Sequence, residues 1–86
     1  MPRKNVGLRQ GTQAHLGGGL SMGLVSVREG RDGAPPEVVL FIKDHGERKV
    51  TLRPGDTFLL DNQTWKLDRI SEAVHNRLGA VFSMIE

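Results

Sequence analysis

The 86-residue chain contains no cysteine, so a disulfide framework, thiolate catalysis and cysteine-based zinc sites are all excluded. It has no tyrosine and few other aromatic residues, which leaves little material for stacking nucleic-acid bases. No apolar run approaches the ~18–20 residues of a membrane-spanning helix, so we expect no membrane association. The absence of cysteine suits a reducing compartment, and no apolar signal segment follows the basic start. We therefore expect a cytoplasmic protein.

Helical periodicity is missing as well. Apolar residues alternate or form short continuous runs, and they do not recur at i, i+3, i+4 and i+7. Eleven glycines and four prolines interrupt the chain often, which is typical of short strands joined by tight turns. The length fits one domain, residues 1–86. We predict an all-β single domain of six to eight short strands built from hairpins, either a small barrel or a two-sheet sandwich.

The strands are predicted where alternating or continuous apolar runs end at turn residues. Within 20–28, the apolar pattern changes phase at Leu24-Val25, which predicts a bulge, a strong twist or burial on both faces. For residues 71–76 two predictions remain: one helical turn capped by Ser71, or a long hairpin loop. The predicted strands include residues 5–10, 12–16, 20–28, 38–42, 57–60, 64–70 and 79–85.

Two predicted hairpins gather the large apolar side chains on one face. In the first, a two-residue turn at His45-Gly46 would pair Phe41 with Val50 and Val39 with Leu52. In the second, a turn at 62–63 would pair Leu60 with Trp65 and Phe58 with Leu67. The expected core is therefore Phe41, Val50, Leu52, Phe58, Leu60, Trp65, Leu67 and Phe82.

The side chains that carry chemistry form no recognisable motif. The histidines are His15, His45 and His75, and none has the spacing that puts two metal ligands on one face. No serine lies in a Gly-x-Ser-x-Gly elbow, and no Gly-Lys-Ser/Thr follows the glycines at 17–19. We therefore predict no catalytic, cofactor-binding or metal-binding residue, and a protein that is not an enzyme.

Charge is distributed unevenly along the chain. Residues 1–28 contain four basic residues and no acid, although the net charge of the whole chain is only +2. A basic end can attract acidic protein surfaces or nucleic acid. We predict that residues 1–19 form a loosely docked N-terminal arm, in which Arg3, Lys4 and Arg9 contact a partner. The alternative is an integral first hairpin whose charges face water.

A sequence pattern extends across the second half of the chain. The pattern consists of a strand, a Gly-Asp turn, an apolar strand, a tight turn, Trp-x-Leu and a final Ile. It is found in residues 50–58 (VTLRPGDTF) and 63–70 (QTWKLDRI). This pattern resembles a family of short uncharacterised bacterial β-proteins, a domain of unknown function. The resemblance implies a β fold and a bacterial source, and it implies no activity.

Together these features predict a non-enzymatic binding or accessory domain that acts through contact with an unknown protein partner. One alternative is a small nucleic-acid-binding β-barrel, which would need an aromatic side chain exposed on a basic face. Another is a small ligand-binding or enzymatic barrel that uses its histidines. A homodimer that forms through edge strands is a further alternative, and the expected edge strands are 5–9 and 79–85.

Overall fold

The computed structural model describes residues 5–30, 32–74 and 77–85, which form eight β-strands. Within these ranges there is no helix that could cross a membrane. The strands form two antiparallel four-stranded sheets, one in the order β1-β8-β7-β6 and the other in the order β2-β3-β4-β5. Their bounds are β1 Asn5–Arg9, β2 Gln13–Gly17, β3 Leu20–Arg28, β4 Glu37–Lys43, β5 Glu47–Leu52, β6 Thr57–Leu60, β7 Gln63–Val74 and β8 Arg77–Ile85.

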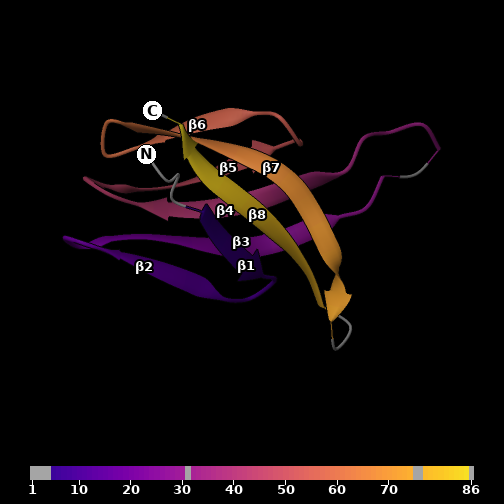
Figure 1. The fold of residues 1–86 in the computed structure, drawn as a ribbon, viewed down its shortest axis with the longest axis horizontal. Helices are drawn as coiled ribbons and strands as arrows, with labels where there is room; N and C mark the ends of the chain where they lie inside the picture. Colours follow the sequence, from indigo (N-terminus) through magenta and orange to yellow (C-terminus); the bar gives the residue numbers. More distant parts are fainter. Residues whose placement is uncertain (1–4, 31, 75–76, 86) are drawn as a thin grey trace.

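The sheets stack face to face as a sandwich, and they do not close into a barrel (Figure 1). The chain changes sheet twice, between β1 and β2 and again between β5 and β6. All other connections are hairpins within one sheet or the loop from β3 to β4. The all-β prediction is confirmed, and of its two architectures the sandwich is the one that forms.

Local features of the predicted strands are also confirmed. The pairing of β3 with β4 shifts register between Leu24 and Ser26, so the predicted change of phase is a β-bulge. The helical turn considered at Ser71 does not form, because β7 continues as a strand to Val74. The rest of that connection, residues 75–76, lies outside the described residues.

The predicted register of the first hairpin is wrong by one residue. Its turn has three residues, Asp44 to Gly46, so that β4 and β5 pair Leu40 with Val50 and Val38 with Leu52. A one-residue slip moves every side chain of a strand to the opposite face. Phe41, predicted in the core, therefore lies half-buried on the outer face. Val50 is half-buried against the core, on the inner side.

The second hairpin keeps its predicted faces although its turn differs. The turn is Asp61-Asn62, with φ of 50° and 65°, the left-handed conformations of a type I′ turn. β6 and β7 pair Phe58 with Trp65 and Leu60 with Gln63. This register differs from the predicted one by two residues, so the same side chains still point inward.

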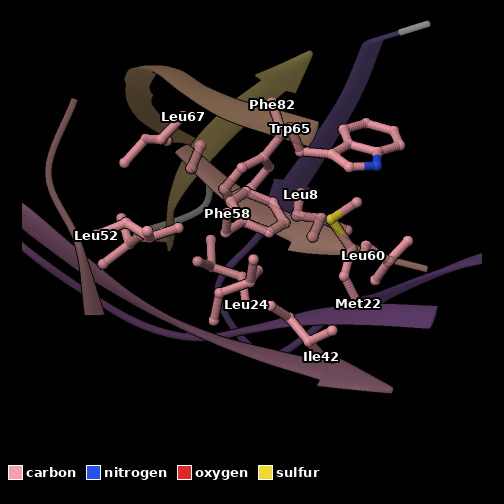
Figure 2. Close-up of a cluster of buried hydrophobic side chains, with 13 residues drawn as sticks. Leu8, Met22, Leu24, Ile42, Leu52, Phe58, Leu60, Trp65, Leu67 and Phe82 are labelled. Carbon is pink, nitrogen blue, oxygen red and sulfur yellow. The ribbon is translucent and has the colours of Figure 1, made fainter. Parts of the chain in front are cut away.

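The core fills the space between the two sheets (Figure 2). Phe58 and Phe82 meet edge to face, with ring centroids 6.0 Å apart and planes at 87°. Trp65 is only 2% exposed, and its indole Nε1 has no hydrogen-bond partner among the described residues. The buried apolar residues are Leu8, Met22, Leu24, Val38, Leu40, Ile42, Leu52, Phe58, Leu60, Trp65, Leu67, Ala80 and Phe82.

We expect Trp65→Ala to lower the free energy of unfolding by about 3–5 kcal/mol, because it leaves a large cavity in a small core. That loss is a large share of the stability of a small domain. Chemical denaturation of the purified variant measures it. An unchanged denaturation midpoint would contradict the central position of Trp65.

Gly79 lies buried in β8 at a place where two neighbouring strands come very close. The Arg9 guanidinium on β1 reaches across it and donates to the Ser71 hydroxyl on β7 at 3.2 Å. A Cβ at position 79 would lie 2.6 Å from both the Leu8 carbonyl oxygen and the Ser71 Oγ. This position therefore admits only glycine without movement of the strands.

We expect Gly79→Ala to destabilise the domain by roughly 1–3 kcal/mol through this overpacking. Gly46→Ala is the matched control, because a Cβ there meets nothing within 4 Å and the backbone is not left-handed. The control should change stability by no more than about 0.5 kcal/mol. Equal melting temperatures for the two variants would contradict the crowding at Gly79.

Candidate functional site

The outer face of the β2-β3-β4-β5 sheet carries an apolar patch. Val39 and Phe41 lie on this face of β4, since they alternate with the buried residues at 38, 40 and 42. Val25 of β3 is 42% exposed and is one of only two large hydrophobic residues exposed to that degree among the described residues. We call Val25, Val39 and Phe41 the outer patch.

The bulge in β3 explains how Val25 joins this patch. Leu24 pairs with Leu40 and Ser26 with Val39, so Val25 is the extra residue and is turned out of the core. Val25 and Phe41 line one hollow of about 320 Å³, together with Gly23. Bulges often re-aim a side chain at functional sites, so this position is a candidate for binding.

Gly23 forms the floor of the hollow because it has no side chain. It lies opposite Gln13 on one side and Phe41 on the other. A Cβ at Gly23 would meet the Gln13 Cγ at 3.1 Å. The missing side chain leaves room for the side chain of Gln13, which lines the same hollow as Phe41.

Charged and polar side chains surround the outer patch. Lys49 on β5 is the direct cross-strand neighbour of Phe41. The next row across the sheet is polar throughout, and it consists of His15, Ser21, Lys43 and Glu47. These four residues and Phe41 line a second hollow of about 410 Å³. An apolar centre with a polar rim is the usual anatomy of a protein-binding surface.

A second polar cluster joins the two sheets at their turns. The Arg48 guanidinium donates to both carboxylate oxygens of Asp44, at 3.1 and 3.2 Å, and also donates to the Leu59 carbonyl on the opposite sheet. The Asp61 backbone N–H donates to Asp44 at 3.2 Å, and His45 Nε2 lies 2.6 Å from the Asp61 carboxylate. We call Asp44, His45, Arg48 and Asp61 the turn clasp.

Asp44 is the centre of this clasp, with a side chain only 10% exposed. The backbone N–H of Asp61 holds the pKa of the Asp44 carboxyl below its ordinary value of 3.8, and the Arg48 guanidinium acts in the same direction. Partial burial opposes them by raising the pKa. The carboxylate is therefore the form that links the sheets.

The histidines are distributed over different parts of the fold. His15 lies on β2, at the edge of the outer face, and His45 lies in the turn clasp; His75 lies outside the described residues. The His45–Asp61 pair resembles the base and orienting acid of a catalytic site, but within the described ranges no hydroxyl is hydrogen-bonded to His45. The described residues contain no cluster of metal-ligating side chains.

Of the three residues predicted to contact a partner, the structure describes only Arg9. Arg3 and Lys4 lie outside the described residues. Arg9 is half-buried at the end of β1, where it bonds to Ser71. β1 pairs with β8 over five residues, and Leu8 is buried in the core. Segment 5–9 is thus hydrogen-bonded into a sheet, but the alternative of a first hairpin is wrong, because β1 and β2 lie in different sheets. Its lower stability relative to the core stays a prediction.

Sequence reasoning missed the outer patch, although a signal for it was present. A strand that is apolar on both faces, such as 38–42, must leave one face outside the core when each sheet has only one inner side. The change of phase at Leu24-Val25 marked the same region from the neighbouring strand. Taken together, these two signals point to the surface that the structure shows.

We expect the turn clasp to weaken on acidification. Because the pKa of Asp44 is lowered in the folded state, its stabilising contribution is complete above pH 3.8 and is lost as pH falls through the folded value. The melting temperature of the wild type should exceed that of Asp44→Asn at pH 5, and the difference should shrink toward pH 2. A difference that does not change over this range would show that the charge of Asp44 contributes nothing.

Comparison with protein families gives the context for these surfaces. A family model described as "Family of unknown function (DUF6406)" matches residues 3–82. No curated protein and no solved structure matches the chain. The match covers almost the whole chain and confirms the resemblance to an uncharacterised domain. The protein therefore belongs to this family of unknown function.

Proposed function

We propose that the chain is a non-enzymatic binding domain that contacts another protein through the outer patch. The observation that carries the proposal is the position of Phe41 and Val25 on the outer face, beside a hollow, when most other large apolar residues fill the core. Contiguous apolar surface on a small domain commonly marks an interaction site. Aromatic residues are the usual anchors of such sites.

The charges around the patch indicate the chemistry of the partner. Lys43 and Lys49 lie beside Phe41, and Glu47 is the acid of the same region. A partner with an apolar contact and a surplus of acidic groups would complement this surface. The absence of cysteine and the resemblance to bacterial β-proteins support the further proposal that this protein is bacterial and cytoplasmic.

Single-stranded nucleic acid is the second candidate, since Phe41 beside Lys43 and Lys49 is an aromatic side chain on a basic surface. This surface offers a single aromatic ring for base stacking, because the other aromatic residues are buried, namely Phe58, Trp65 and Phe82. Binding proteins of this class use several aromatic platforms along one groove. The protein partner is therefore the better supported proposal.

The test is quantitative affinity capture from the source organism with four forms of the protein: wild type, Val25→Gln, Phe41→Gln and Arg69→Gln. Val25 is exposed and should tolerate glutamine without loss of stability. Arg69 is exposed on the other sheet and serves as the matched control. We expect the captured amount of one protein to be at least tenfold lower with the two patch variants than with the wild type. With the control, the captured amount of that protein should be unchanged.

Two outcomes would contradict the proposal. The first is a captured protein that is equally abundant with all four forms. The second is saturable binding of a single-stranded oligonucleotide that is lost in Phe41→Gln and weakens steeply with salt, which would establish the nucleic-acid candidate. Light scattering on the same samples shows whether the captured partner is a second copy of this chain, the homodimer expected from edge strands.

A further inference from the structure

A groove runs between the two edge strands β5 and β6. These strands follow one another in the chain and lie at the same side of the sandwich, but each belongs to a different sheet. The groove has a volume of about 530 Å³. Its floor contains the core residues Leu52 and Phe58 together with the half-buried Val50. Apolar core residues therefore lie directly beneath an unpaired strand edge.

On the opposite side of the sandwich, the turn between β1 and β2 ties the two sheets together. There the Gln10 N–H donates to the Leu78 carbonyl of one sheet, and the next residue, Gly11, donates to the Leu24 carbonyl of the other, at 2.9 and 2.8 Å. The sheets also contact each other most through β1, β2, β3 and β8. In the described part of the chain no backbone hydrogen bond joins β5 to β6. The unpaired backbone groups of β5 thus border an open groove.

Arg48 closes one end of the groove. Its guanidinium donates to the Leu59 carbonyl and so takes the place of a backbone N–H at the edge of β6. β6 has only four residues, and short edge strands resist pairing with other chains. β5 has six residues. Of the two strands that border the groove, β5 is therefore the one more available to a partner.

We propose that β5 binds an extended segment of a partner protein by strand addition, with apolar and acidic residues alternating along that segment. A strand paired with β5 would direct every second side chain over Val50, Leu52 and Phe58, where apolar groups fit. The other side chains would lie on the outer face beside Lys49. In the described residues Lys49 has no ion pair, so an acidic group there has a free cation to meet.

Charged groups other than Lys49 also lie on or beside this edge. The Asp56 carboxylate accepts the Arg53 backbone N–H at 2.9 Å and so belongs to the turn that ends the groove. Glu47 lies directly opposite Lys43. At the position paired beside Lys49 an acidic side chain is therefore favoured and a basic one is repelled. The proposal stands on the groove and not on the outer patch, so either can fail alone.

The test uses end-capped eight-residue peptides added to isotope-labelled protein, with amide chemical shifts as the readout. One peptide alternates valine and glutamate, and a second alternates valine and lysine. Two further Val–Glu peptides carry N-methyl groups, one on every valine and the other on every glutamate. Successive backbone N–H groups of a strand point to opposite sides, so only one of these two can still pair with β5.

We expect the Val–Glu peptide to shift amides of 47–52 saturably and the Val–Lys peptide to bind at least tenfold more weakly. One N-methylated peptide should bind and the other should not. Lys49→Glu should reverse the preference between glutamate and lysine. Val25→Gln should bind the Val–Glu peptide like the wild type, which separates this site from the outer patch.

Three results would overturn the proposal. One is no saturable shift at about 1 mM peptide, the weak limit of specific affinity. Another is equal binding by both N-methylated peptides, which would exclude backbone pairing. The third is a set of shifts centred on β1, β2 or the outer patch and not on β5. Amide spectra of the free variants verify that each protein is folded before titration.

Discussion

Each strand of this sandwich has one face that can be buried and one that cannot, because two four-stranded sheets enclose a single interior. Among the described residues, thirteen buried apolar side chains fill the inner faces, and Met22, Leu40 and Phe82 are among those fully covered. Further apolar residues pack around the margin of this core or lie on an outer face. Val25, Val39 and Phe41 are on the surface for this reason, and the same constraint that builds the core thus creates the outer patch.

The sequence predicted the second hairpin better than the first because their turns have different origins. Asp61 and Asn62 adopt left-handed backbone conformations that suit these residue types, so that turn is set by local chemistry. The turn at 44–46 is tied to Arg48 and to the Asp61 backbone of the other sheet. That contact spans 17 residues and is invisible to a local turn rule. Because 38–42 is apolar at every position, its pattern could not correct the one-residue error.

The surfaces were harder to predict than the strands for a related reason. Val25 and Phe41 look like core residues in the sequence, and only register decides which face they occupy. The edges were predicted from position in the chain, which succeeded for β1 and failed for residues 79–85. β8 pairs with both β1 and β7 and is therefore central in its sheet. The strands at the edges are β1, β2, β5 and β6, and this order depends on long-range pairing that composition does not encode.

The outer patch and the open edge meet at one residue. Across the sheet, Gln13, Gly23, Phe41 and Lys49 form a single row, and Lys49 is its last member before the unpaired edge of β5. A strand added to β5 would continue this row, with its own side chain next to Lys49. Main-chain pairing would then supply affinity along the edge, and the patch would supply side-chain contacts that distinguish one partner from another. If both proposals hold, one partner would use both surfaces, with its strand on β5 and a flanking apolar group on the outer patch.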